Sequence, residues 1–265
     1  MTSVGAELLA VVERSPQATA AHDRPSWVGL FTPDGRVEDP YGSRPHVGYD
    51  RIGRFYDTFI APRRVVFRRD VDVVAGNAVV RDLTLEIVMD AAVTLDVPMH
   101  LRYDLRECNG DWAIQRLRAH WELPLMVVTM LRQGARSLPV SARLAAELLR
   151  NQGLSGTAGF VSGFVRPGRR QRRRVAALLD AAVAGDHVGV RRALSHGASV
   201  THGEDVPLAA GDLVDRLRGG HWTKPIAAGD TVSASVHTPS GRGVVFCEIP
   251  SIATGVTRIQ YFGPQ

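Results

Sequence analysis

Several features are scarce in this chain of 265 residues, and each scarcity excludes a class of protein. The only cysteines are Cys108 and Cys247, far apart and without a second cysteine or histidine at metal-ligand spacing. We therefore expect reduced thiols, no metal site and, since no cofactor motif occurs, no cofactor. No apolar run approaches the ~18 residues that a membrane-spanning helix needs, and the amino-terminal residues lack a secretory signal pattern. We expect a cytoplasmic protein.

The chain is also poor in aromatic residues around its main cluster of charge. Part of the net charge of +5 lies in one run, RPGRRQRRR at residues 166–174. Single-stranded nucleic acids stack on aromatic side chains, and none is interleaved with this run. We interpret it as a solvated linker and expect no nucleic-acid partner.

The composition is that of a folded protein, with 45% hydrophobic and 22% charged residues. The length suits two modest domains. The first thirty residues have a helical pattern, interrupted by Ser15-Pro16. Because proline removes a backbone donor, and because Ser-Pro is a common helix start, we expect a kink or a restart at Ser15, with its hydroxyl capping the helix.

A third helix is predicted over residues 48–60, where Ile52, Phe55, Tyr56 and Phe59 recur at helical spacing. From Val65 onward the period changes to two, which predicts a run of antiparallel strands. The dipeptide Asn109-Gly110 indicates a tight hairpin before a last strand near residues 112–121. Helices followed by strands define an α+β domain, with the helices on one concave face of the sheet.

Residues 123–165 have a different character, with two apolar or amphipathic helices and a glycine-rich stretch. They would close one end of the cavity that such a half-covered sheet leaves. The alternative is docking on a membrane surface, which we favour less because an apolar helix face usually packs on its own protein. We place the domain boundaries at residues 1–122, 123–174 for a helical and basic linker, and 175–265.

The last segment repeats the first weakly. Residues 182–202 align without gaps on residues 19–39, with Asp186 over Asp23 and His202 over Asp39. We infer a tandem arrangement in which a degenerate second copy packs on the first as an intramolecular pseudo-dimer, and a homodimer is the alternative. His202 has no visible partner, and we expect it to have a structural or surface role.

The string LFTPDGRVEDPYGSRPHVGYDRIGRFY, residues 30–56, resembles the bacterial delta-5-3-ketosteroid isomerases and SnoaL-like proteins of the nuclear-transport-factor-2-like superfamily. The segments that match in order are 37–40, 42–43, Gly48 and 55–56. The resemblance covers about the first 122 residues. It implies a cone-shaped curved antiparallel sheet covered by helices, enclosing a hydrophobic, polycyclic or steroid-like small molecule.

The resemblance also implies a chemistry. Asp39 lies at the position of the family's base, which lifts a proton from the carbon beside a ketone and returns it elsewhere. Such a reaction needs a carboxylate in an apolar cavity and donors that stabilise the enolate oxygen. The alternative for Asp39 is an aspartate that orients the turn before Pro40.

The family's two oxyanion donors are replaced here. One falls on Ser15. The other falls on the strand MHLRY, residues 99–103, where alternation places Met99 on the apolar face with Leu101 and Tyr103, and His100 on the opposite face. The same alternation argues against an epoxide-hydrolase-like site at Arg102 and Asp104.

The sequence therefore predicts Asp39 as the one catalytic candidate. The predicted ligand contacts are Ser15, Phe31, Tyr56, Met99, Tyr103 and Trp121. Isomerase-type proton transfer and binding without catalysis both remain open. The alternative from another class is a structural or interaction protein whose cone is plugged by Trp121 and Met99, and whose apolar 123–165 segment docks a partner or a membrane.

Overall fold

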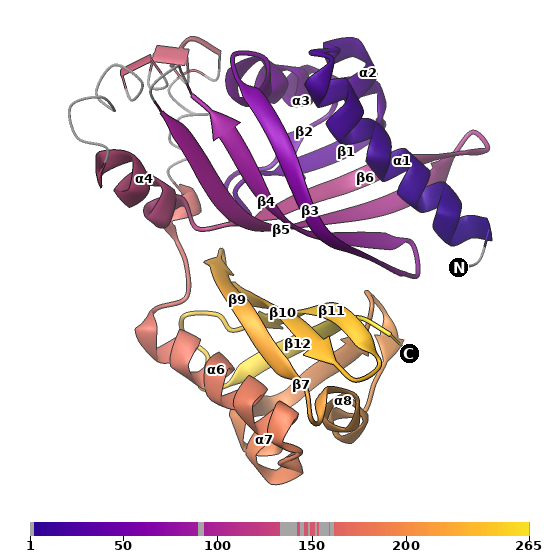
Figure 1. Ribbon diagram of the computed structural model, residues 1–265, viewed down its shortest axis with the longest axis vertical. Coiled ribbons are helices and arrows are strands. Elements are labelled where there is room, and N and C mark those ends of the chain that lie inside the picture. The colour runs from indigo at the N-terminus through magenta and orange to yellow at the C-terminus, as the bar shows by residue number, and fades with distance from the viewer. Residues whose placement is uncertain are drawn as a thin grey trace.

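The computed structural model describes residues 3–89, 93–132 and 162–264, and also 142–143, 146–147, 149–151, 153 and 159. Two α+β units are stacked with their sheets facing each other and their helices outward (Figure 1). The first comprises α1 (Ser3–Ala20), α2 (Arg24–Gly29), β1 (Phe31–Glu38), β2 (His46–Val47), α3 (Tyr49–Phe55), the π-helix η1 (Tyr56–Ile60), β3 (Arg64–Ala75), β4 (Ala78–Val88), β5 (Thr94–Cys108) and β6 (Asp111–His120).

The second unit repeats this order of elements. It comprises α6 (Arg169–Ala184), α7 (His187–Ala193), β7 (Leu194–His202), β8 (Val206–Pro207), α8 (Ala210–Leu217), β9 (His221–Ala228), β10 (Thr231–Thr238), β11 (Gly241–Glu248) and β12 (Val256–Phe262). The strand orders are β2-β1-β6-β5-β4-β3 and β8-β7-β12-β11-β10-β9. Each sheet is antiparallel except for one parallel pair, β1 with β6 and β7 with β12, which departs from the fully antiparallel sheet expected. The tandem arrangement is confirmed.

The helix caps show the repeat at the level of single residues. Asp23 accepts a hydrogen bond from the backbone N–H of Ser26 and so caps α2. Asp186, which aligns with it in the sequence, caps α7 by accepting from the N–H groups of Val188 and Gly189. These side chains accept hydrogen bonds from backbone N–H groups that have no partner within the first turn of a helix.

The first helix differs from the expectation. α1 runs unbroken through Pro16, and Ser15 does not begin a helix. Val11, Val12 and Ala18 are buried on both sides of the proline, so packing against the sheet holds the two halves in line. The Ser15 hydroxyl accepts a hydrogen bond from the indole N–H of Trp27 at 3.1 Å. The predicted kink and cap at Ser15 are therefore wrong.

The other local predictions for the first unit are confirmed. Ile52, Phe55 and Tyr56 are buried in the predicted third helix, where α3 continues into η1. Asn109 and Gly110, both with positive φ, form the turn between β5 and β6. This is the backbone conformation that an Asn-Gly hairpin turn needs.

The two sheets pack on each other through the faces that carry no helices. Strand alternation sends Val79 into the core of the first unit and Val80 toward the second unit. There Val80 meets Val244 and Phe246. The opposite face of the first sheet, which the strand alternation predicts to be polar, therefore also contacts the second unit.

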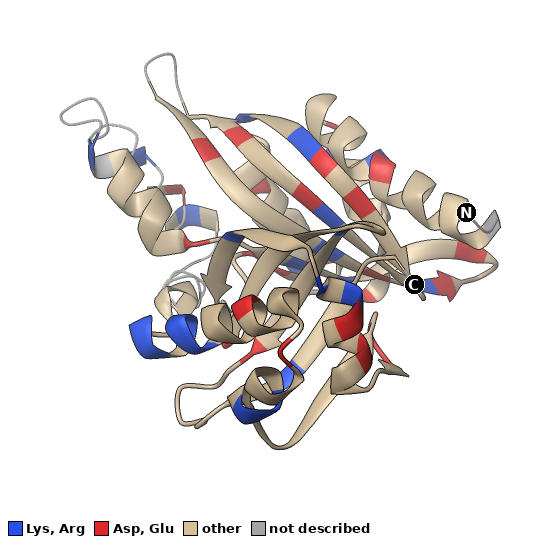
Figure 2. Cartoon of the chain, turned by 60° about the horizontal axis from the view of Figure 1, so that its bottom comes forward, with Lys and Arg blue, Asp and Glu red and all other residues tan. Residues whose placement is uncertain are grey.

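The connection contains α4 (Leu123–Arg132) and the 3-10 turn η3 (Ser162–Phe164). The second helix expected within residues 123–165 falls mostly outside the described residues. The basic run is not a free linker, since α6 begins at Arg169 and arginines gather at its start (Figure 2). Arg166 and Arg172 form ion pairs with Glu122 at 2.5 and 2.8 Å. Within the described part of the chain, no helix has the length and apolar character to span a membrane.

Candidate functional site

A cavity of about 120 Å³ lies between the helices and the concave face of the first sheet. Its wall is mostly apolar and contains few polar side chains. The lining residues include the aromatic and aliphatic groups Trp27, Phe55, Phe59, Leu85, Met99, Leu101, Leu117 and Met126, and the polar groups Ser15, Thr19, Asp39, Arg63 and Tyr103. A ligand here would be held mainly by apolar contact.

Asp39 follows directly after β1 and lines this cavity. Its carboxylate accepts one hydrogen bond, from the indole N–H of Trp121 at 2.6 Å. Burial raises the pKa of Asp39 to about 6, and the hydrogen bond from Trp121 opposes this only in part. The group is thus poised to accept or release a proton near neutral pH.

Ser15 and Tyr103 bring two hydroxyls into the same cavity. Tyr103, from β5, is 1% exposed and hydrogen bonds with Ser15, from α1. Burial raises the pKa of Tyr103 to about 12. The tyrosine therefore keeps its proton and can donate it in a hydrogen bond. Ser15 lines the cavity because α1 is continuous, whereas a capping role would have turned its hydroxyl to the backbone.

Strand alternation in β5 decides which residues reach the cavity. Met99, Leu101 and Tyr103 line the cavity, as the alternation of side chains along the strand predicts. His100 lies on the other face, where its ring nitrogens contact Ser233 and Ser235 of the second unit at 2.8 and 3.0 Å. Trp121 also lines the cavity.

Two predicted ligand contacts, Phe31 and Tyr56, lie elsewhere. Both are buried against the ring of Trp27, with centroids at 5.0 and 5.5 Å, and neither is among the cavity-lining residues. The Trp27 ring thus lies between the cavity and the side chains of Phe31 and Tyr56. Phe31 and Tyr56 support the wall from behind.

Two polar lining residues were not anticipated. Thr19 lies four residues after Ser15 on α1, and this helical spacing was the available signal. Arg63 donates to the backbone carbonyl of Thr58 at 2.5 Å and pairs with Glu147 at 2.6 Å. No local pattern links Arg63 to a glutamate so distant in the sequence.

In the second unit, His202 lies at the position that aligns with Asp39, but among the described residues it does not line a comparable cavity within that unit. His202 is 8% exposed, and its Nε2 lies 2.9 Å from the backbone carbonyl of Gly263. It therefore has a local partner. The interior of this unit is filled by its own core, including Leu213, Val232 and Ile259.

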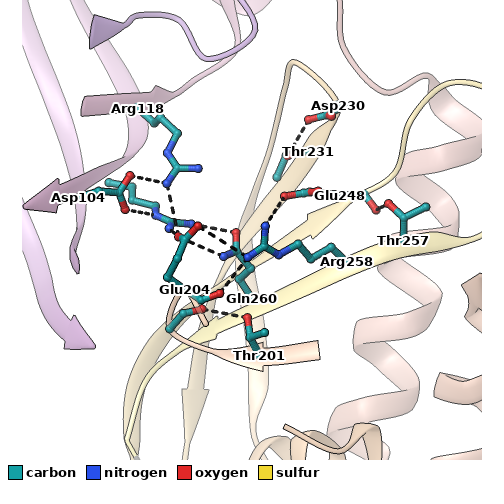
Figure 3. Close-up of polar contacts among 12 residues, drawn as sticks. Asp104, Arg118, Thr201, Glu204, Asp230, Thr231, Glu248, Thr257, Arg258 and Gln260 are labelled. Carbon is teal, nitrogen blue, oxygen red and sulfur yellow. Dashed lines mark hydrogen bonds and ion pairs between the residues drawn. The ribbon is translucent and has the colours of Figure 1, made fainter. Parts of the chain in front are cut away.

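Charged residues join the two units along one side (Figure 3). Asp104 pairs with both Arg102 and Arg118, while Arg102 donates to the side chain of Gln260 at 2.8 Å and pairs with Glu204. Burial lowers the pKa of Arg102 to about 10, opposed by the charge of Asp104. Arg102 and Asp104 thus belong to the contact between units and lie outside the cavity.

The match to a known protein family lies in the first unit. Residues 12–114 match the family described as a SnoaL-like domain. No group of three or more histidine, cysteine, aspartate or glutamate side chains in the described ranges could hold a metal ion.

Several solved structures are similar to about half of the chain. RV0760c from Mycobacterium tuberculosis, in complex with estradiol-17beta-hemisuccinate, is 25% identical over 44% of this chain and 95% of its own, with a TM-score of 0.41. The delta-5-3-ketosteroid isomerase from Mycobacterium sp. is 24% identical over the same shares, also with a TM-score of 0.41. A variant of Rv3472, a protein of unknown function from Mycobacterium tuberculosis, is 19% identical over 54% of this chain and 88% of its own, with a TM-score of 0.42.

Residues 12–114, which include most of the helix-covered sheet of the first unit, are SnoaL-like. The structure has two sheet-and-helix units, which is consistent with a second copy of the fold. The expected family resemblance and α+β fold class are confirmed.

Proposed function

We propose that the first unit binds a hydrophobic, polycyclic or steroid-like small molecule in its cavity, and that Asp39 transfers a proton on that molecule. The observation that carries this proposal is a carboxylate in an apolar cavity, with one hydrogen-bond donor and a pKa near 6. A base of that pKa is largely ionised at pH 7 and still basic enough to abstract an activated proton.

The mechanism needs a donor for the oxygen that gains charge when the proton leaves. Neither Ser15 nor Met99 reproduces the pair of donors that the family resemblance implies. Tyr103 supports proton transfer instead, since its hydroxyl is protonated and lines the cavity that contains Asp39. A donor held in a low-dielectric site stabilises an oxyanion more than water does.

The size of the cavity restricts how such a ligand enters. The volume of about 120 Å³ is below the roughly 300–1,000 Å³ of pockets that enclose drug-sized ligands. The wall includes Met89, Met99 and Met126, whose flexible side chains repack more readily than branched or aromatic ones. We expect these methionines to move when a polycyclic ligand binds.

The test uses 5-androstene-3,17-dione, a 3-keto-delta-5 steroid whose isomerisation creates a conjugated ketone that absorbs in the ultraviolet. Wild type, Asp39→Asn and the exposed-site control Asp50→Asn are compared by absorbance and by thermal shift. We expect turnover in wild type and Asp50→Asn, and its loss in Asp39→Asn. Stabilisation by the steroid without turnover would leave a binding protein, and no response to any steroid would exclude the steroid-like ligand.

One observation favours the alternative of a docking protein. Leu125 and Val128 on α4 are 48% and 42% exposed, and Arg132 follows them at the helix end. Cosedimentation with vesicles containing phosphatidylserine, using wild type and Leu125→Glu, tests a membrane contact. Binding that the substitution removes, together with no steroid response, would support this second function.

A further inference from the structure

The α1 side of the cavity carries a hydroxyl without a hydrogen-bond partner among the described residues. Thr19 is 3% exposed and lines the cavity, yet its Oγ1 is unsatisfied. A buried hydroxyl without a partner destabilises a folded protein. Residues Ser15 and Thr19 are four apart in a continuous helix, so they share a face about one turn apart.

The neighbouring hydrogen bonds have a direction that can be worked out. The indole nitrogen of Trp27 is a donor only, so the bond from Trp27 to Ser15 occupies an acceptor position on the serine. The proton of Ser15 is then available for Tyr103, its other partner. When Ser15 donates to the Tyr103 oxygen, the hydroxyl proton of Tyr103 remains free to point into the cavity. The chain of hydrogen bonds also makes the Tyr103 hydroxyl a stronger donor.

We propose that Tyr103 and Thr19 form a subsite for the oxygen-bearing end of the ligand. Tyr103 donates a hydrogen bond to that oxygen, and Thr19 supplies a second hydrogen bond to the same polar end. Trp27 and Ser15 are positioning residues that act through Tyr103. The inference rests on the proposed function, because it requires that the cavity binds a small molecule.

The charges around the cavity disfavour an acidic ligand. The Asp39 carboxylate is ionised above pH 6 and repels an anionic group, while Arg63 is already paired with Glu147. An acidic ligand would therefore meet a negative charge and no free cation among the described lining residues. The subsite fits a neutral ketone or phenol oxygen on an otherwise apolar ring system.

The test compares two probes that differ by one oxygen, estradiol and 3-deoxyestradiol. We expect wild type to bind estradiol about tenfold more tightly, the value of one good hydrogen bond. Tyr103→Phe should abolish this preference while leaving the affinity for 3-deoxyestradiol unchanged. Ser15→Ala should reduce the preference without changing 3-deoxyestradiol binding, a pattern that a purely structural role would not produce.

Thr19 is tested with Thr19→Val, which removes the hydroxyl at nearly constant shape, and with Thr19→Ser, which keeps it. We expect Thr19→Val to weaken estradiol binding several-fold and to raise the melting temperature of the free protein. Thr19→Ser should retain the estradiol preference. A valine variant with unchanged affinity, or with a lower melting temperature, contradicts the role of Thr19.

The outcomes separate the subsite from the function on which it rests. Equal affinity of wild type for both probes overturns the subsite and leaves a cavity that binds apolar molecules. Binding of neither probe by wild type overturns the subsite and the proposed steroid-like ligand together.

Discussion

Burial of the Asp39 carboxylate makes it a stronger base, and the same burial lowers the stability of the folded protein when Asp39 is ionised. Its pKa in the folded protein is about 6, above the value near 3.8 of an unperturbed aspartate. The folded state therefore binds more protons than the unfolded state between these values. Stability is highest below the unfolded pKa and falls as the pH rises through about 6.

Asp39→Asn should remove this penalty. At pH 8 we expect the variant to be more stable than wild type by up to about 3 kcal/mol, because folding raises the pKa of Asp39 from 3.8 to about 6. At pH 3 the advantage should largely disappear, because Asp39 is then mostly protonated in both states. Urea denaturation at the two pH values measures the difference. A variant less stable than wild type at pH 8 would show that the contact with Trp121 outweighs the desolvation of the carboxylate.

At the scale of elements, an aspartate caps the start of the second helix in both units. Asp186 accepts from two backbone N–H groups at 3.0 and 2.8 Å, while Asp23 accepts from one at 3.0 Å. Both residues connect a long first helix to a short second one. The cap helps to set the angle at which each helix pair packs on its sheet.

Removing the second-unit cap with Asp186→Ala should destabilise the protein by about 1 kcal/mol, since the helix start loses its side-chain acceptor. Asp186→Asn is the matched control, because asparagine caps equally well. Thermal denaturation should show a melting temperature lowered by about 2–4 °C in the alanine variant only. Equal losses in both variants would indicate that the charge of Asp186, and not its capping geometry, matters.

The whole molecule depends on polar groups buried between the two sheets. Lys224, the only lysine in the chain, reaches from β9 to the Asp82 carboxylate at 2.5 Å and to the backbone carbonyls of Leu83 and Met99. An ammonium group has three donors, and here each has an acceptor. Burial opposes ionisation of Asp82, but the charge of His100 and the contacts from Lys224 and Ser235 keep its pKa below the usual value.

Lys224→Met should therefore be strongly destabilising, because it leaves the Asp82 charge buried with too few partners. We expect a loss of about 3–5 kcal/mol in urea denaturation. The double variant Lys224→Met with Asp82→Asn should recover part of this loss, since the unpaired charge is gone. If the double variant is no better than the single one, packing of the lysine stem is the dominant contribution.

Much of the fold was determined by short-range patterns in the sequence. The α+β order, the third helix, the Asn109-Gly110 hairpin and the alignment of Asp186 with Asp23 all depend on local periodicity, turn chemistry or capping. The alternation in β5 also separated Met99 and Tyr103 from His100. These signals are readable because a strand or a helix start constrains residues only a few positions apart.

The tertiary structure decided the rest. It kept α1 straight through Pro16, because packing on the sheet outweighs the local preference to break, and this turned Ser15 from a cap into a cavity residue. It placed Trp27 in front of Phe31 and Tyr56, and it buried the face of His100 and Arg102 against the second unit. Each outcome depends on a partner distant in sequence, and local patterns contain no information about such partners.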